Sequence, residues 1–309
     1  MGITALAAVV HRFGSPDVIQ IEPVTVPPPG AGQVRIRVHA SGVGPWDVRI
    51  RSGTAVPLPA LPVVLGADLA GVVESLGPDV TSVQVGEAVF GTTGDSFTGA
   101  CAELAVADAS RICRRPTMLT SIEAAVLPVA GCTALEMVEV ADPRPGMRTL
   151  VLGGPGSVGA WVTQLALERG AEVARLVQRH EAAAARRAGP GRVLTPLRAR
   201  SPRFDLVLDP VGGELARAAL RLLRSGGTLV SSVEQLDPES QGRVDVSARW
   251  VRAQITSARL KFLSRWIDAG CISVTLGEVL GFQDAILAHR KVEGLERKAA
   301  GNVVLRVSE

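Results

Sequence analysis

The chain has 309 residues, a length that accommodates two domains of ordinary size. Hydrophobic residues make up 47% of it and charged residues 20%, which is typical of folded globular proteins rather than disordered ones. The formal net charge of only +3, with scattered arginines, argues against a nucleic-acid partner. No apolar run approaches the ~18 residues of a membrane span. No convincing export signal opens the chain, so we expect a cytoplasmic protein with no membrane partner.

Residues 1–120 have the pattern of an all-β region. Apolar and polar residues alternate at 34–38, 69–74 and 88–90, and clusters of Gly and Pro separate these segments. Alternation with a period of two, punctuated by Gly and Pro, predicts antiparallel strands in a small barrel.

The pattern changes near residue 121, where an Ala-rich helix begins that Thr120 can cap. Strands and helices then alternate. The predicted strands are 149–152, 173–177, 192–194, 205–208 and 228–233, and the predicted helices are 158–169, 181–188 and 214–224. This alternation predicts an α/β domain with a parallel sheet covered on both faces. Residues 256–309 add two helical segments and a final strand at 303–307.

A glycine-rich turn follows the first of these strands and opens the first helix. In Gly154-x-Gly156-x-x-Gly159, the first Gly permits a tight turn and the second lets the backbone approach a diphosphate. The third lets helix and strand pack closely. Backbone N–H groups near Ser157 and Val158 then face the anion, and the helix dipole reinforces them. The motif predicts a dinucleotide site.

The residues after the predicted strand 173–177 favour NADPH over NADH. An NAD site usually carries an acidic residue about 20 positions after the turn, where it holds the ribose 2′-hydroxyl. Arg179 and His180 stand there, and 174–180 contain no Asp or Glu. A cation would pair with the 2′-phosphate of NADPH. The alternative is that Arg179 is simply a solvated surface residue.

Several motifs in order along the chain carry a family resemblance. They lie at residues 11–18, 42–47, 65–73, 85–91, 127–134, 209–213 and 226–230. Together they resemble the zinc-independent quinone oxidoreductases of the medium-chain dehydrogenase/reductase superfamily over nearly the whole chain. The resemblance implies a GroES-like β-barrel catalytic domain at 1–120 and 256–309, and a Rossmann domain with a doubly wound parallel sheet at 121–255. It also implies hydride transfer from NADPH to a small-molecule quinone or activated double bond, and a homodimer.

The resemblance assigns roles to individual residues. It places Thr133 near the nicotinamide and Gly156, Ser157 and Val158 at the diphosphate. The other implied positions are Val211 and Gly212 at the adenosine side, Ser231, Ser232 and Val233 beside the nicotinamide, and Trp46 and Val64 as walls of the substrate pocket. Two positions depart from the family: Gly44 stands where Asn is usual, near the nicotinamide and substrate, and Asn302 stands where a Lys near the cofactor is common.

The sequence predicts no metal. Zinc-dependent relatives carry a Cys where Gly44 stands and a Gly-His-Glu where Gly66-Ala67-Asp68 stands. The four cysteines are scattered, with no C-x-x-C pair. Zinc requires about three or four N, S or O ligands, and these positions do not supply them.

Reduction of a conjugated carbonyl needs a hydrogen-bond donor for the developing enolate. Without zinc, that donor is a backbone N–H, water, or a hydroxyl such as that of Thr133. Asp47 is the candidate acid/base, and the alternative is an ion pair with Arg49 or Arg51 that fixes a turn. We therefore expect an NADPH-dependent reductase of quinones or α,β-unsaturated carbonyls, with a role in bacterial secondary metabolism. The changes at Gly44 and Asn302 keep open an alternative, a biosynthetic cyclase that closes a ring without net reduction.

Overall fold

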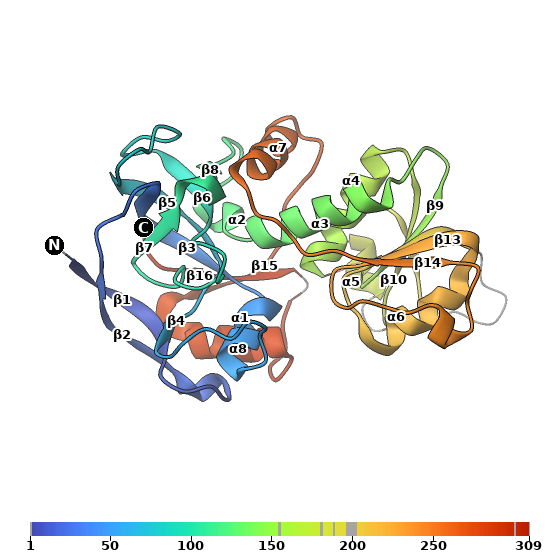
Figure 1. Ribbon diagram of the computed structural model, residues 1–309, viewed down its shortest axis with the longest axis horizontal. Helices are drawn as coiled ribbons and strands as arrows, with labels where there is room; N and C mark the ends of the chain where they lie inside the picture. Colours follow the sequence, from blue (N-terminus) through green and yellow to red (C-terminus); the bar gives the residue numbers. More distant parts are fainter. Residues whose placement is uncertain are drawn as a thin grey trace. The chain divides into compact units, whose positions relative to one another are not determined.

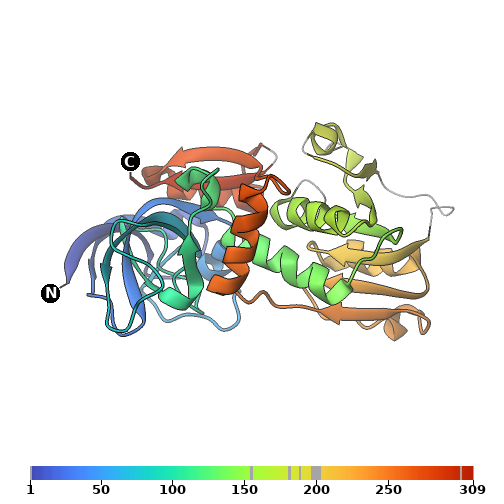
Figure 2. The ribbon, with the colours of Figure 1, turned by 90° about the horizontal axis from the view of Figure 1, so that it is seen from above.

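The computed structural model describes residues 2–153, 156–179, 182–187, 189–195, 203–299 and 301–308. The chain folds into two compact units, one formed by Met1–Val129 with Ile255–Glu309 and the other by Ala130–Gln254. Figure 1 labels the elements of both units, and Figure 2 shows them from above. In the described ranges no helix combines the length and apolar character needed to cross a membrane.

The first unit contains two sheets. The smaller has the order β2-β1-β4, and the larger has the order β15-β16-β3-β5-β6-β8 with β7 paired to β3. The bounds are β1 Ile3–Val10, β2 Ile19–Val26, β3 Gln33–Val43, β4 Val63–Val64, β5 Asp68–Leu76, β6 Ala88–Thr92, β7 Leu104–Asp108, β8 Ile112–Arg114, β15 Leu276–Gly281 and β16 Asn302–Arg306. Val34, Ile36 and Val38 alternate along β3 and are buried in one apolar core with Leu69 and Val89. The predicted antiparallel pairing is confirmed for β3 with β5 and β7.

The prediction that residues 1–120 are all-β was wrong at one point. Helix α1, Pro45–Ser52, interrupts the strands. Pro45 stands at its first turn, Asp47 caps the backbone N–H of Gly44, and Gly53 ends it with a φ of 82°. These are ordinary helix boundary signals. This helix was not predicted from the sequence, because it is short and has no apolar stripe.

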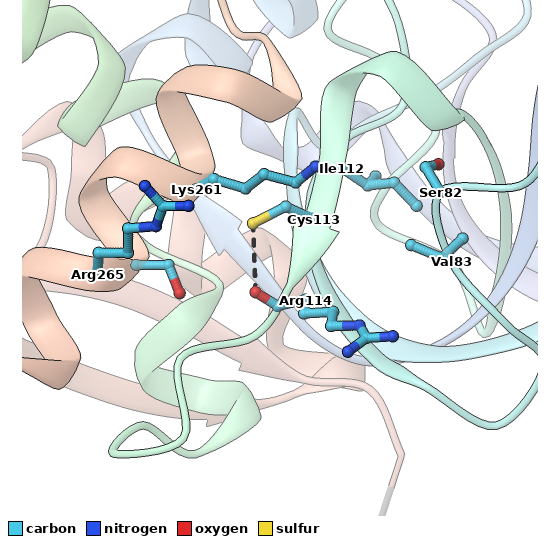
Figure 3. Close-up of a pocket in the computed structure, with 8 residues that line it drawn as sticks. Ser82, Val83, Ile112, Cys113, Arg114, Lys261 and Arg265 are labelled. Carbon is cyan, nitrogen blue, oxygen red and sulfur yellow. Dashed lines mark hydrogen bonds between the residues drawn. The ribbon is translucent and has the colours of Figure 1, made fainter.

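The C-terminal segment returns to the first unit. It contains α7, Ser257–Asp268, and α8, Ala285–Glu293, which confirms the two predicted helical segments. The final strand β16 is confirmed as well, but β15 was not predicted, since its side chains are mostly half-buried without clear alternation. β15 pairs parallel to β16, which pairs antiparallel to β3. Helix α7 lies beside β8, and a pocket opens between them (Figure 3).

The second unit is built on a parallel sheet with the order β11-β10-β9-β12-β13-β14. Counted within the unit this is 3-2-1-4-5-6, the strand order of a Rossmann fold. The strands are β9 Arg148–Leu152, β10 Glu172–Leu176, β11 Arg192–Leu194, β12 Phe204–Asp209, β13 Leu223–Ser231 and β14 Ser247–Trp250. The helices are α3 Pro128–Ala141, which continues from the first unit after the short α2 Ser121–Ala124, then α4 Ser157–Glu168, α5 Ala182–Arg187 and α6 Gly213–Ala219.

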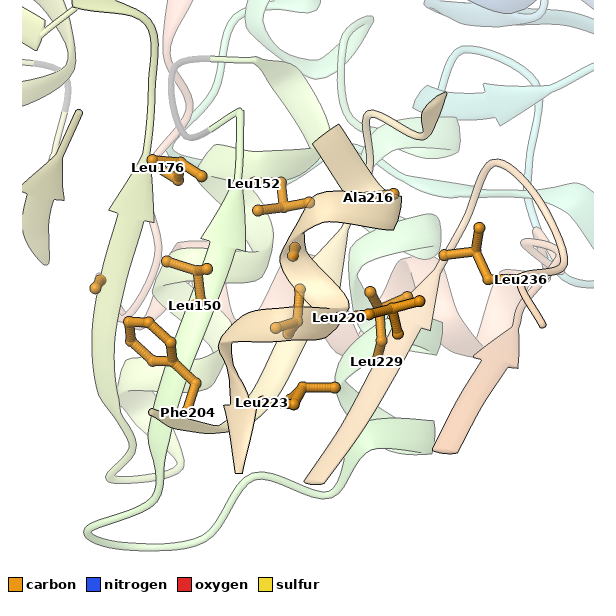
Figure 4. Close-up of a cluster of buried hydrophobic side chains, with 12 residues drawn as sticks. Leu150, Leu152, Leu176, Phe204, Ala216, Leu220, Leu223, Leu229 and Leu236 are labelled. Atoms are coloured by element: carbon orange, nitrogen blue, oxygen red, sulfur yellow. The ribbon is translucent and has the colours of Figure 1, made fainter. Parts of the chain in front are cut away.

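Helices cover both faces of this sheet, with α4 and α6 on opposite sides (Figure 1). Leu150 and Leu152 alternate along β9 and pack with Ala216 from α6 and Leu220 from the 3-10 turn that follows it (Figure 4). Between them Val151 faces the other way and is also fully buried. Burial of both faces explains why these strands are unbroken apolar runs in the sequence.

Two predictions in this unit need correction. The helix expected over 214–224 ends at Ala219, and a short 3-10 turn leads directly into β13 at Leu223. Gly226 and Gly227 therefore lie within β13, where Gly226 has a φ of 78° and its N–H bonds to the Asp245 carbonyl. β14 was not predicted, because it is an edge strand with mostly exposed side chains.

Candidate functional site

The carboxyl edge of the second unit's sheet is the natural place for a ligand. The strand order reverses between β9 and β12, and ligands of such sheets bind in the crevice at this switch point. Gly153 follows β9 with a φ of 64°, and Val211 follows β12. A Cβ on Gly153 would lie 2.5 Å from Val211 Cγ2, so only glycine fits at this close approach.

The first turn of α4 lies at this edge. Gly156 is the N-cap, and its own N–H bonds to the Gly153 carbonyl at 2.9 Å. The first bond within the helix is from the Ala160 N–H to the Gly156 carbonyl. In the part of the chain described, the N–H groups of Ser157, Val158 and Gly159 have no acceptor, as expected for a helix start. Such a turn binds anions such as a diphosphate. Gly154, predicted to belong to this turn, lies outside the described residues.

Asp209 ties together the loops that follow β12 and β13. It is fully buried, and its Oδ1 accepts the N–H groups of Val211 at 2.9 Å and Gly212 at 2.8 Å. Its Oδ2 accepts the hydroxyl of Ser231 at 2.7 Å, and that hydroxyl oxygen accepts the Val233 N–H at 3.1 Å. The hydroxyl proton of Ser231, a predicted cofactor residue, is therefore donated to Asp209.

Gly212 brings the same two loops into contact. It has a φ of 75°, and a Cβ there would lie 2.7 Å from Val233 Cγ1. Val211 is 46% exposed, whereas Ser232 and Val233 are half-buried. The predicted cofactor residues of this edge thus lie together on loops set by a buried carboxylate that the sequence analysis did not single out.

Two arginines near the end of β10 differ in whether their charge is available. Arg175 is buried, and its Nη2 donates to the carbonyls of Ala185 at 2.7 Å and Gly189 at 2.8 Å. Burial lowers the Arg175 pKa. Arg179 is exposed just beyond the strand, and it has no acidic partner within the described ranges. Arg179 is therefore the accessible cation at this position, while His180 lies outside the described residues.

In the first unit, Asp47 joins two loops. Its Oδ2 accepts the Gly44 N–H at 2.7 Å and its Oδ1 accepts the Ala67 N–H at 3.0 Å. Only 3% of Asp47 is exposed, and burial raises the pKa of its carboxyl to about 6 although the backbone N–H groups lower it. The predicted alternative partner Arg51 instead donates to the Gly14 carbonyl and to Glu293 Oε1. Asp47 therefore has a structural role, but its partners are amides and not a guanidinium.

Asp68 begins β5 and holds the start of α3. Its Oδ1 accepts the Val129 N–H at 2.9 Å. Burial, opposed by that N–H and assisted by the charge of Asp47, raises the pKa of Asp68 well above its usual value. Asp47 thus lies close enough to influence the ionisation of Asp68.

The predicted pocket walls of the first unit lie near these carboxylates in the chain. Trp46, in α1, packs edge-on against Phe97 with ring centroids 5.6 Å apart. Val64 is half-buried on β4, and its carbonyl accepts the Gly99 N–H at 2.8 Å. A Cβ on Gly44 would meet only Asp47 Oδ2, at 3.7 Å, so this position has room for a side chain.

The remaining predicted residues lie in different units. Asn302 begins β16 in the first unit, and its Nδ2 donates to the Thr275 carbonyl at 3.3 Å. Thr133 is on α3 in the second unit and is only 8% exposed. The side-chain amide of Asn302 thus stabilises the strand start.

The residues present do not fit a zinc ion. The structure's described residues include no group of three or more His, Cys, Asp and Glu side chains that could hold a metal. Cys101, Cys113 and Cys132 are buried as free thiols. Gly44 and Ala67 offer no ligand atoms in their side chains.

Two family models match the chain. The alcohol dehydrogenase GroES-like domain matches residues 30–140, and the zinc-binding dehydrogenase family matches residues 184–305. The chain is 37% identical to the quinone oxidoreductase of Mus musculus over 53% of this chain, an alignment that spans only 50% of the mouse protein.

Solved structures are similar over their full length. A quinone oxidoreductase from Coxiella burnetii has a TM-score of 0.88 and 26% identity, covering 99% of this chain and 100% of that one. The mycobacterial protein Rv1454c complexed with NADPH has a TM-score of 0.86 and 30% identity, covering 98% and 100%. The predicted GroES-like and Rossmann folds are confirmed. The chain belongs to the medium-chain dehydrogenase/reductase superfamily, among its quinone oxidoreductase-like members.

Proposed function

We propose that the chain is an NADPH-dependent, zinc-independent reductase of a quinone or an α,β-unsaturated carbonyl compound. The observation that carries the proposal is the edge of the Rossmann sheet at β9 and β12. There α4 begins, and the N–H groups of Ser157, Val158 and Gly159 have no acceptor among the described residues, next to a loop pair held by Asp209. The mycobacterial relative, whose structure contains NADPH, supports a nicotinamide cofactor.

The choice of NADPH rests on Arg179. Its guanidinium is exposed after β10, and it would pair with a 2′-phosphate that NADH lacks. Arg175 does not compete for this role, since its Nη2 donates to backbone carbonyls. We therefore assign the diphosphate to the α4 amides and the 2′-phosphate to Arg179.

Bound NADPH would supply the hydride, and the chain would hold the acceptor and stabilise the charge that forms on its oxygen. We propose the Thr133 hydroxyl as a donor to that oxygen, since it lies on the predicted nicotinamide segment and little of it faces solvent. We assign Asp47 and Asp68 positioning roles, because their oxygens accept backbone N–H groups of the surrounding loops. Water would supply the proton.

We further propose a cytoplasmic homodimer that forms through the Rossmann sheets. β14 is the edge strand of that sheet and pairs only with β13 among the described strands, so one side of its backbone is free. Trp250 at its end is 47% exposed. Light scattering should give twice the mass of the 32.2 kDa chain, and a monomeric mass would contradict this part of the proposal.

The main test is turnover with a panel of quinones and enones, followed by the loss of NADPH absorbance and by mass spectrometry of the product. Reduction adds one hydride and one proton to the acceptor for each NADPH oxidised. A product of unchanged mass would mean ring closure or isomerisation, an alternative that the names of the relatives do not support. Tight NADPH binding without turnover of any acceptor would contradict the reductase assignment.

A further inference from the structure

A pocket of about 370 Å³ lies within the first unit, between strand β8 and helix α7 (Figure 3). This volume is within the range of small-molecule sites. The residues that line it are Ser82, Val83, Ile112, Cys113, Arg114, Lys261, Ser264 and Arg265. Every one of them belongs to the first unit, and none belongs to the Rossmann sheet edge described above.

The α7 side of the pocket carries two cations and a hydroxyl. Lys261, Ser264 and Arg265 stand at positions i, i+3 and i+4, so they share one face of the helix. Leu260, Leu263 and Ile267 anchor the helix, and all three are buried. Figure 3 shows the Lys261 side chain extending from α7 toward β8.

Neither cation is paired with an acidic side chain among the described residues. No acidic residue lines the pocket, and neither Lys261 nor Arg265 has an ion-pair or hydrogen-bond partner in the ranges that the structure describes. Asp268, three residues after Arg265, is held by other groups, since its Oδ1 accepts the hydroxyl of Thr117 at 3.0 Å and the N–H of Met118 at 3.1 Å; among the described residues it forms no ion pair with Lys261 or Arg265. Two like charges four residues apart destabilise a helix slightly, so a bound anion would relieve their repulsion.

The β8 side supplies an apolar floor. Val83, Ile112 and Cys113 are buried, and burial raises the pKa of the Cys113 thiol to about 12, so the thiol adds no negative charge. Arg114 lies at the rim and forms an ion pair with Glu87. Among the residues that line the pocket, Lys261 and Arg265 are therefore the cations without an acidic partner in the described chain. Ser82 completes the rim with a second hydroxyl.

We propose that this pocket binds a phosphate monoester of a small apolar or aromatic alcohol. A monoester carries nearly two negative charges near neutral pH and three strong acceptor oxygens, which match two free cations and the serine hydroxyls. A carboxylate would leave one cation unpaired. The apolar floor would receive the organic group. This site goes beyond the proposed reductase activity and does not depend on it.

The test is calorimetric titration of the protein with phenyl phosphate at low ionic strength. The protein is first saturated with NADPH, so that the α4 amides of the dinucleotide site are occupied. Phenyl phosphate should bind at one site per chain, more tightly than inorganic phosphate or benzoate, and added salt should weaken it.

The key variant is K261Q/R265Q, which keeps the helix and removes both charges. It should lower the affinity for phenyl phosphate at least tenfold, and NADPH oxidation should stay unchanged. The matched control R12Q/R221Q removes two exposed, unpaired cations of the described chain that are outside the pocket, and it should change the affinity less than twofold.

Three results would overturn the proposal. One is the absence of measurable binding to the wild type. Another is an equal loss of affinity in both double variants, which would indicate only a general charge effect. The third is tighter binding of benzoate or inorganic phosphate than of phenyl phosphate, which would contradict the ligand class. Thermal unfolding of each variant verifies that the fold is retained.

Discussion

The two units use the same device, a buried aspartate that joins two loops, in different settings. In the Rossmann unit, Asp209 accepts the Val211 and Gly212 N–H groups and the Ser231 hydroxyl. The loops it joins follow two neighbouring parallel strands, so the sheet already brings them together. In the GroES-like unit, Asp47 accepts the N–H groups of Gly44 and Ala67, which come from the start of a helix and the approach to a strand.

The two aspartates differ in the kind of strand pair beside them and in the partners of their carboxylates. Asp209 joins loops at the carboxyl ends of two parallel strands, whereas Asp47 joins the two segments that flank one end of the antiparallel β3–β5 pair, next to the Ser41–Leu69 register. Asp209 has a hydroxyl partner in addition to amides, and that hydroxyl extends the network to Val233. Burial raises the pKa of Asp47, so its ionised form is costly despite its amide donors. We expect the first network to contribute more to stability and the second to respond more to pH.

The largest expected effect is that of Asp209→Ala. It leaves two amides and a hydroxyl without their buried acceptor, which should cost about 3–5 kcal/mol of unfolding free energy. Affinity for NADPH should fall together with stability, because the loops beside Gly153 lose their anchor. Denaturant unfolding and NADPH titration measure the two effects.

Two milder variants separate the network from general damage to the core. Asp209→Asn keeps an acceptor for the amides and should lose less than the alanine variant. Ser231→Ala removes one hydrogen bond and should cost roughly 1–2 kcal/mol. Equal losses in all three variants, or no loss in Asp209→Ala, would contradict the network as described.

These networks also mark the limit of what could be predicted from the sequence. Hydrophobic periodicity located β9, β10, β12 and the helix α4 within a residue or two, because each has a clear apolar pattern in the sequence. The glycine-rich turn is local, and its role could be inferred from its spacing.

What could not be predicted depends on contacts distant in the sequence. Asp209 and Ser231 are 22 residues apart, and nothing local indicates that they meet. Arg175 and Arg179 are both cations near the end of β10. Only the folded structure shows that Arg175 is buried and donates to backbone carbonyls, whereas Arg179 is exposed. The strands β14 and β15 lack strong alternation of apolar and polar residues. Their strand conformation depends on pairing with β13 and β16.

The second prediction concerns the pH dependence of stability at Asp47. Its carboxyl has a raised pKa of about 6 in the folded chain, against an ordinary value of 3.8. The folded state therefore binds more protons between these values, and the free energy of unfolding falls as pH rises through that window. The loss approaches about 3 kcal/mol at neutral pH.

Asp47→Asn should remove this slope, while its amide nitrogen opposes one of the two N–H donors and lowers stability at every pH. The measured quantity is the difference in unfolding free energy between wild type and variant across the acidic range. That difference should shrink as pH rises, because only the wild type bears the cost of ionisation. A difference that is constant with pH, or that widens, would show that Asp47 does not titrate as described.

The third prediction uses the contrast between Arg175, within β10, and Arg179, just beyond its end. Arg179→Ala should weaken NADPH binding about tenfold, equivalent to ~1.4 kcal/mol, and leave NADH binding unchanged. Arg186→Ala, which removes an exposed cation from α5, is the matched control and should affect neither cofactor. Fluorescence titration with both cofactors measures the effect. An equal decrease for NADH and NADPH would place Arg179 away from the 2′-phosphate.

The smallest expected effect is at Gly44, where the loop held by Asp47 departs from the family. Gly44→Asn is sterically allowed, since its Cβ would meet only Asp47 Oδ2 at 3.7 Å and its φ of −129° suits any residue. Gly44 is the N-cap of α1. At this position Asn stabilises a helix more than Gly does, by roughly a few tenths of a kcal/mol. Stability should therefore rise slightly, and turnover should change only if the new amide reaches the nicotinamide. A destabilisation above about 1 kcal/mol would show that the Asp47 loops have no room for this side chain.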